Sequence, residues 1–175
     1  IPGLAGLVSV IIFFRLIGAE EYGKYSLIFS YTNLIAAFSF GWLNQSILRY
    51  RSTYNSSVEI ISPVLMGFIF GIVLVIIFVI IASIFQFPIF FSNYHIIFLA
   101  LSIGIFNILK SFFQSEELPN KVILITSAQS LLMILFSMLL LKFYNNNSES
   151  LILGVSFGYL IPILPFTKLF RTNIT

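Results

Sequence analysis

Long apolar stretches alternate with short polar segments along the whole chain, and charged residues stand almost only in the polar segments. A helix that crosses the roughly 30 Å hydrocarbon layer of a bilayer needs about 20 mostly apolar residues. Six stretches approach or exceed that length. The pattern therefore predicts transmembrane helices at about residues 1–17, 22–45, 60–85, 94–113, 122–141 and 151–170.

The connections between these stretches are too short to hold a domain of their own. Short connections make consecutive helices antiparallel neighbours. The apolar runs are continuous rather than alternating, which excludes the strands of a membrane β-barrel. We therefore predict an all-α fold, a polytopic transmembrane bundle of about six helices over residues 1–175. Because the chain starts at Ile1 inside an apolar stretch, we expect the beginning of the first helix to be missing and the chain to be a fragment of a longer protein.

The amino-acid composition is typical of a membrane protein, and it excludes several kinds of metal and catalytic site. The chain is 59% hydrophobic and 9% charged, whereas soluble domains carry roughly 25% charged residues. There is no cysteine or aspartate and only one histidine, His95. A thiolate metal site is excluded, and neither a cofactor, a metal nor an enzymatic site is predicted. No long run of basic residues is present, so nucleic acid is not an expected partner.

The basic residues favour one orientation, because loops on the cytoplasmic side carry more lysine and arginine. With the N-terminal end placed in the cytoplasm, three basic residues fall outside: Arg15, Lys24 and Lys142. Six fall inside: Arg49, Arg51, Lys110, Lys121, Lys168 and Arg171. We therefore expect residues 18–23 and 142–150 to lie at the outer surface.

Small and polar residues form stripes with helical spacing on two of the predicted helices. The stripe on 22–45 consists of Ser26, Ser30, Asn33, Ala37, Gly41 and Asn44. The stripe on 94–113 consists of Ala100, Gly104, Asn107, Ser111 and Gln114. Two interpretations remain open, namely close packing of helices in lipid and the lining of a polar central cavity. The second makes the amides of Asn33, Asn44, Asn107 and Gln114 candidate ligands for sugar hydroxyls.

Two glycine pairs have G-x-x-x-G spacing, Gly67 with Gly71 and Gly154 with Gly158. We expect both pairs to allow close helix packing. Arg15 and Arg49 end the first two predicted helices. They either extend toward the membrane surface or bind an anionic group, since a guanidinium forms bidentate contacts with phosphate.

The segment from Phe14 to Ser26, FRLIGAEEYGKYS, resembles the R-L-L-G-P-E-E-Y-G-x-Y-S signature of polysaccharide flippases. These are the Wzx-type exporters of O-antigen and capsule, within the multidrug/oligosaccharidyl-lipid/polysaccharide exporter superfamily. Pro2-Gly3 and the segment from Gly41 to Tyr50 are also similar to this family. Helix spacing agrees along the whole chain, whereas the specific motif covers only about residues 2–50.

The resemblance implies that residues 1–175 form the first, N-terminal bundle of a two-bundle, MATE-like transporter in the inner or plasma membrane of a bacterial or archaeal cell. The implied activity is transfer of an undecaprenyl-diphosphate-linked oligosaccharide across that membrane, with other polysaccharide-assembly membrane proteins as partners. It also makes Arg15 and Arg49 the leading substrate contacts. Two alternatives remain, a multidrug or organic-cation exporter of the same superfamily and a membrane glycan polymerase or ligase. The first expects a carboxylate deep in a helix and the second a large outer loop, and neither feature is visible.

Overall fold

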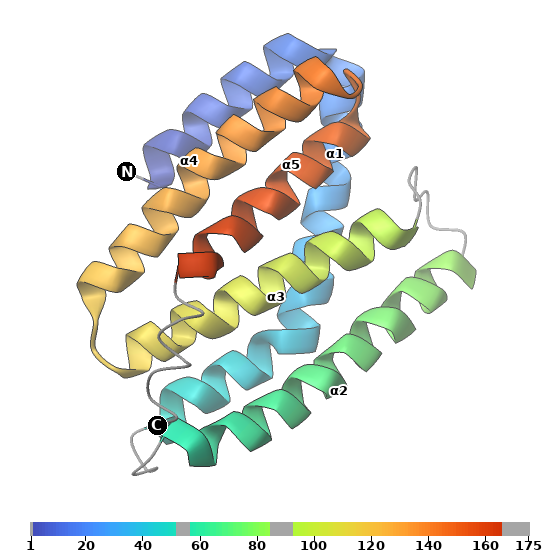
Figure 1. Cartoon of the computed structure of the whole chain (residues 1–175). Helices are drawn as coiled ribbons and strands as arrows, with labels where there is room; N and C mark the ends of the chain where they lie inside the picture. Colours follow the sequence, from blue (N-terminus) through green and yellow to red (C-terminus); the bar gives the residue numbers. More distant parts are fainter. Residues whose placement is uncertain (1, 52–56, 85–92, 166–175) are drawn as a thin grey trace.

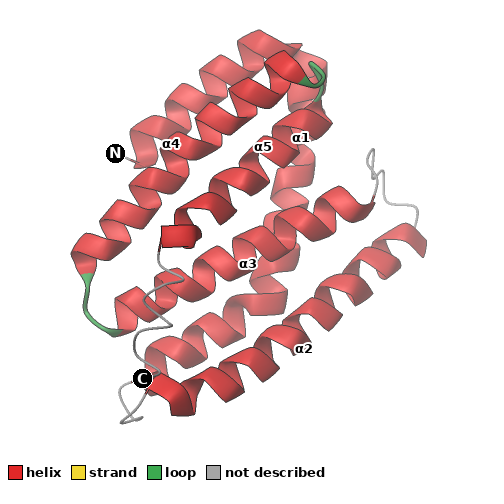
Figure 2. Ribbon diagram, in the orientation of Figure 1, coloured by secondary structure: helices red, strands yellow, loops and turns green. Residues whose placement is uncertain are grey.

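The computed structural model describes residues 2–51, 57–84 and 93–165 (Figure 1). Within these ranges the regular structure is entirely helical (Figure 2), which confirms the all-α prediction. The elements are α1 (Pro2–Tyr50), α2 (Ser57–Ile84), α3 (Asn93–Ser115), α4 (Pro119–Phe143), α5 (Ser148–Leu160) and the short 3₁₀ turn η2 (Ile161–Ile163). The predicted helical residues 1, 85 and 166–170, together with Lys168 and Arg171, lie outside the described residues.

Helix α1 contains two arms joined at a single glycine. Gly18 has φ 81° and ψ 170°, a combination that is essentially restricted to glycine. The residues after it return at once to helical geometry, so the connection expected at 18–23 is reduced to Gly18. Two carboxylates, Glu20 and Glu21, open the second arm, where negative charge favours the positive end of the helix dipole. Figure 1 shows the first arm turning there and the second arm running back behind the bundle.

Four of the described helices are long and apolar enough to cross a membrane. The first, Gly3–Tyr50, would be about 70 Å long if straight, more than twice the hydrocarbon thickness. The bend at Gly18 divides it into a first arm of about 24 Å (residues 2–17) and a second arm of about 48 Å (residues 19–50), so the second arm alone exceeds the hydrocarbon thickness. α5 with η2 is a shorter apolar segment. A membrane-embedded, all-α bundle is therefore the architecture of the described chain.

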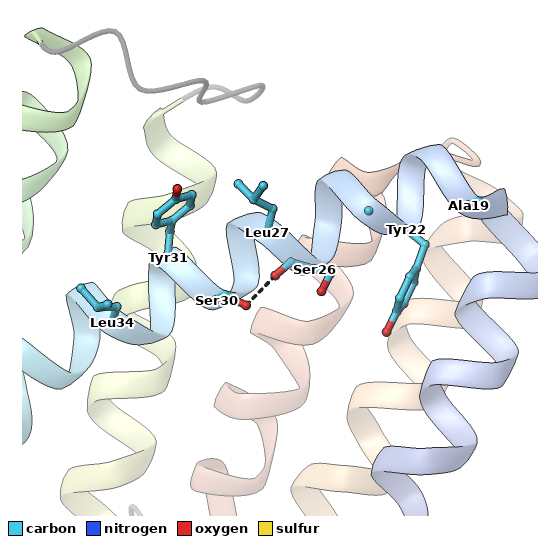
Figure 3. A pocket seen from close by; sticks show the side chains of 8 residues that line it. Ala19, Tyr22, Ser26, Leu27, Ser30, Tyr31 and Leu34 are labelled. Carbon is cyan, nitrogen blue, oxygen red and sulfur yellow. Dashed lines mark hydrogen bonds between the residues drawn. The ribbon is translucent and has the colours of Figure 1, made fainter.

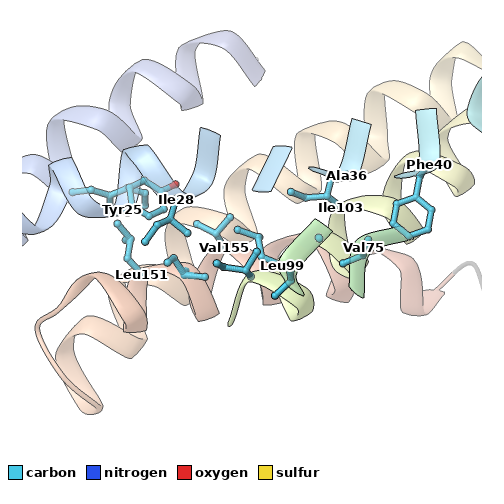
Figure 4. Close-up of a cluster of buried hydrophobic side chains, with 14 of the residues drawn as sticks. Tyr25, Ile28, Ala36, Phe40, Val75, Leu99, Ile103, Leu151 and Val155 are labelled. Atoms are coloured by element: carbon cyan, nitrogen blue, oxygen red, sulfur yellow. The ribbon is translucent and has the colours of Figure 1, made fainter. Parts of the chain in front are cut away.

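The second arm of α1 is the central element of the core. Its buried side chains, among them Ile28, Ala36 and Phe40, pack against α2, α3 and α5. Figure 4 shows this cluster, in which Leu99 and Val155 approach the arm from the other helices. Because side chains on one face of a helix recur every three or four residues, a single stripe of α1 is buried here and the opposite stripe is left open.

Glycines bring the helices close together at two places. A Cβ on Gly71 or Gly104 would lie 2.4 or 2.6 Å from the Phe40 ring. A Cβ on Gly154 would lie 2.4 Å from the backbone Cα of Ser137, where α5 crosses α4. Contacts this short leave no room for a methyl group, and small residues are the usual means of close helix approach in lipid. The close packing predicted for the glycine pairs is confirmed.

Two tertiary contacts mark the two ends of the bundle. At one end the side-chain amide of Asn146 donates to the carbonyl of Leu16 at 3.1 Å, which joins the α4–α5 loop to the bend of α1. At the other end Arg51 forms an ion pair of 3.1 Å with Glu116 in the α3–α4 turn. The loops that the charge pattern assigns to the outer surface thus meet at the first end, and two segments assigned to the inner surface meet at the second.

Candidate functional site

The two arginines proposed as substrate contacts lie at opposite ends of the second arm. Arg15 is exposed just before the Gly18 bend. Arg49 is exposed near the end of α1, with its guanidinium carbon 5.5 Å from the centre of the Tyr50 ring. Arg49 lies 31 positions after Gly18, which corresponds to about 46 Å of helix. The structure therefore does not bring the two arginines together, and a single phosphate cannot contact both in this conformation.

The amides of α1 lie at the edge of its buried face. Asn33 is half-buried, and its side-chain nitrogen donates to the carbonyl of Phe29 at 2.8 Å within the same helix. Asn44 is also half-buried, and its side-chain oxygen is enclosed without a hydrogen-bond partner among the described residues. A buried, unsatisfied amide oxygen costs about 1–3 kcal/mol. Among the candidate amides, Asn44 thus has a side-chain oxygen that could accept a hydrogen bond from a ligand or from water.

The stripe on α3 faces the protein interior rather than a hollow. Ala100, Gly104 and Ser111 are buried, and Gly104 lies directly against Phe40 of α1. Asn107 is half-buried on this same face, and Gln114 is exposed at the end of α3. The middle of this stripe therefore serves helix packing. The stripes of α1 and α3 do not face one another across a cavity in the described chain.

The stripe on α1 has the opposite surroundings. Gly23, Ser26, Ser30 and Ala37 are exposed, and Gly41 is half-exposed. These five residues are called the α1 open face below. No atom lies within 4 Å of where a Cβ on Gly23 or Gly41 would be, in contrast with the tightly packed glycines of the core. The open face consists of small residues, two of them serines, and has no partner among the described helices.

A hollow of about 610 Å³ lies along the first half of this face. Figure 3 shows its lining side chains, with Ser26 and Ser30 between Tyr22 and Tyr31. The Ser30 hydroxyl donates to the carbonyl of Ser26 at 2.8 Å. Its oxygen keeps free lone pairs, because a hydroxyl can accept as well as donate. The hollow therefore offers two serine hydroxyls and two tyrosine side chains within a lining that also contains the apolar Ala19, Leu27 and Leu34.

A charged cluster stands at the end of the hollow nearest the Gly18 bend. Lys24 forms ion pairs with Glu20 at 2.9 Å and with Glu21 at 2.8 Å. Glu20 and Glu21 precede the apolar stretch predicted to cross the membrane, residues 22–45, so we expect them outside the hydrocarbon layer. The hydrogen bond from Lys24, followed by those from Ser148, lowers the pKa of Glu21 to about 2. Glu21 is therefore negatively charged at neutral pH, and it holds Lys24 and the start of α5 by these bonds.

Sequence reasoning missed three contributors to this region. The stripe pattern did not include Tyr22 and Tyr31, yet both line the hollow. Ser148 was not singled out, yet it binds the Glu21 carboxylate. The segment NNNSES could have indicated Ser148, because an asparagine before a helix is a common N-cap. Asn147 caps α5 by accepting a hydrogen bond of 3.1 Å from the Ser150 N–H. In the described part of the chain no three histidine or carboxylate side chains gather in a way that could hold a metal ion.

Comparison with known families now adds to this geometry. A family model described as polysaccharide biosynthesis protein matches residues 1–174, nearly the whole chain. The chain belongs to the polysaccharide biosynthesis protein family. No curated protein and no solved structure matches it significantly. Together with its membrane-crossing helices, membership of this family places the protein in the membrane, with a role in polysaccharide assembly or transport.

Proposed function

We propose that this protein is a flippase, which moves a lipid-linked oligosaccharide of the undecaprenyl-diphosphate type across the cytoplasmic membrane. The α1 open face and its hollow are the observation that carries the proposal. The rest of the described surface is largely apolar, with exposed side chains such as Leu65, Ile80 and Leu131. A polar stripe within the hydrocarbon layer needs water, a polar ligand or another protein segment, because uncompensated hydroxyls are costly there.

The chemistry of this stripe suits a sugar. Serine hydroxyls exchange hydrogen bonds with sugar hydroxyls and carry no charge, so a neutral saccharide binds without a strong electrostatic attraction. Tyr22 and Tyr31 add ring surfaces on either side of the serines. Arg15 and Arg49 lie toward the two membrane surfaces, where the diphosphate of the substrate would stand before and after transfer. Each arginine would then serve a different stage rather than one shared site.

The plasma membrane follows from this substrate, because lipid-linked saccharides are assembled on its cytoplasmic leaflet and used on the opposite one. Alternating exposure of a midplane path is the general design of transporters that move such cargo. The cargo lipid and other membrane proteins of polysaccharide assembly are the proposed partners. No step in this scheme breaks or forms a covalent bond, so the protein acts as a transporter and not as an enzyme.

Complementation tests the proposal. The protein is expressed in a bacterial strain that lacks its own flippase and makes a matching glycan, and surface polysaccharide is measured by immunoblot. Restored surface polysaccharide is the expected result. A Ser26→Leu/Ser30→Leu double variant should reach the membrane in normal amount and restore much less, whereas Ile80→Leu should match the unaltered protein. Failure of the unaltered protein, despite insertion and a matching glycan, would overturn the proposal.

A further inference from the structure

A second concavity lies between α2 and α3, away from the α1 open face. It encloses about 390 Å³ and is called the α2–α3 groove here. Its walls are Ile61, Val64, Leu65 and Phe68 of α2 with Ile105, Ile108 and Phe112 of α3. All seven residues are within the candidate membrane spans Ile61–Ile84 and Tyr94–Ser115. The groove therefore opens within the bilayer and not in water.

Only an apolar occupant fits these walls. No side chain in the lining can donate or accept a hydrogen bond. A sugar or a peptide backbone placed here would lose its hydrogen bonds to water without replacement, at a cost of roughly 2–7 kcal/mol per group. Within a bilayer the remaining choices are a hydrocarbon chain and the apolar face of another helix.

The lining favours a chain that is thinner than a helix. Helices of this protein approach one another through glycine, as Gly104 does against Phe40 and Gly154 against Ser137. The α2–α3 groove has no glycine, alanine or serine in its walls. Branched and aromatic side chains hold a second helix backbone at a distance, because close approach in lipid relies on small residues. A hydrocarbon chain needs no such approach.

The positive charge of Arg49, near the Val64 end of the groove, favours one kind of lipid chain over others. Val64 lines the groove and also a smaller hollow of about 190 Å³, whose wall includes Tyr50. Arg49 stacks on that tyrosine with its guanidinium exposed. The Val64 end of the groove therefore adjoins the hollow that Tyr50 lines, and Arg49, next to Tyr50 in the chain, carries a group that binds phosphate oxygens in bidentate fashion. This arrangement fits a lipid with a phosphate directly at the end of its chain.

We propose that the α2–α3 groove holds the polyisoprenoid chain of the substrate lipid, with its diphosphate at Arg49. The inference rests on the flippase function and names the part of the cargo that remains in the hydrocarbon layer. It assigns separate surfaces to the two parts of one substrate. The α1 open face serves the saccharide, and the α2–α3 groove serves the chain.

Photocrosslinking tests the inference in the intact protein. Benzoylphenylalanine replaces Leu65 in the groove or, as a matched control, Ile80, which is exposed on the same helix outside it. Each variant is placed in phosphatidylglycerol and phosphatidylethanolamine vesicles with alkyne-tagged undecaprenyl diphosphate, and irradiated. We expect several-fold more tagged lipid on the Leu65 variant. Untagged undecaprenyl phosphate should compete, and added phosphatidylglycerol should not.

Other outcomes overturn the inference. Equal labelling at both positions, or equal competition by phosphatidylglycerol, means that ordinary bilayer lipid fills the groove. Crosslinking to another segment of the protein itself means that a helix fills it. An Ile108→Trp variant, which narrows the groove, should reduce both labelling at position 65 and surface polysaccharide, whereas Ile80→Trp should reduce neither. If the unaltered protein restores surface polysaccharide while position 65 labels no better than position 80, the groove inference alone fails. Without restoration, the flippase function itself fails.

Discussion

The carboxylate of Glu21 accepts a hydrogen bond of 3.0 Å from the backbone N–H of Ser148, 127 residues further along the chain, and a second bond from the Ser148 hydroxyl. Ser148 is the first residue of α5, so a negative charge stands at the positive end of that helix. The nearby bond from Asn146 to the carbonyl of Leu16 fastens the same loop to the other side of the Gly18 bend. One loop thus fixes both arms of α1.

This contact predicts a pH dependence of stability. The pKa of Glu21 is lowered from 4.5 to about 2 in the folded protein, so the carboxylate stabilises the fold fully above about pH 4.5. That contribution is lost as pH falls toward 2, since the proton then binds the folded protein too. At pH 7 we expect Glu21→Gln to melt below the unaltered protein, and the difference to shrink between pH 4.5 and 2. Thermal unfolding of the purified protein in detergent across this range measures it.

The matched control is Glu20→Gln. Glu20 also pairs with Lys24, but its side chain is 84% exposed, and exposed ion pairs contribute little. Its melting temperature should stay close to that of the unaltered protein at every pH. An equal effect of both substitutions would show that Lys24 alone, and not Ser148, gives Glu21 its importance.

The bend of α1 predicts a cost for any side chain at Gly18. The positive φ with extended ψ is open to glycine alone, so Gly18→Ala should destabilise the protein by about 1–3 kcal/mol. Space is not the reason, because nothing lies within 4 Å of the position of the added Cβ. Gly23→Ala, equally open but in helical geometry, should have no cost or should stabilise slightly. Denaturant or thermal unfolding compares the pair, and equal stability of the two variants would contradict the argument.

At the α4–α5 crossing we predict a cost that arises from lack of space, whereas the cost at Gly18 arises from backbone conformation. Gly154 has ordinary helical geometry, yet its added Cβ would lie 2.4 Å from the Ser137 backbone. Gly154→Ala should therefore cost about 1–3 kcal/mol through forced separation of the helices. Gly41→Ala, with no atom within 4 Å of its Cβ position, is the control and should lose no stability. Melting temperatures and the yield of monodisperse protein in detergent report the difference.

Water access along α1 predicts a labelling pattern. Cysteine can be placed singly, because the chain contains none. Ser30→Cys on the α1 open face should react with a membrane-impermeant maleimide in intact cells or inverted vesicles. Two control variants should stay unlabelled. Ile80→Cys is exposed in the described chain and we expect it to face lipid, and Leu99→Cys is buried in the core. Protection of Ser30→Cys from both sides would favour a covering helix over a polar path.

Arg49 predicts a graded loss of transport. Arg49→Ala should lower surface polysaccharide strongly at equal membrane abundance, because it removes the proposed contact with the diphosphate. Arg49→Lys should retain part of the activity, since it keeps the charge and loses the bidentate geometry. Lys142→Ala, a cation at the other end of the bundle that stacks on Phe143, should have little effect. A similar decrease for Arg49→Ala and Lys142→Ala would mean that only overall charge matters.

The sequence by itself determined the class of the protein and the positions of its helices. The length of each apolar run and the placement of charge are local properties, and the bilayer requires that every spanning segment be helical. The motif from Phe14 to Ser26 was equally local, and it named the family that the comparison with family models then supported. The glycine spacings likewise indicated close packing before any helix had been paired.

Tertiary structure alone decided which face of each helix is covered. The stripes on α1 and α3 have the same spacing and similar residues, yet Gly104 is pressed against Phe40 while Gly41 faces open space. The difference depends on the orientation of α1 among its neighbours, which long-range contacts determine. The same holds for the bond between Asn146 and Leu16, since neither side chain type nor spacing links residues 130 positions apart. Helix periodicity determines which residues share one face of a helix, and only the packing of the bundle determines whether that face is buried or exposed.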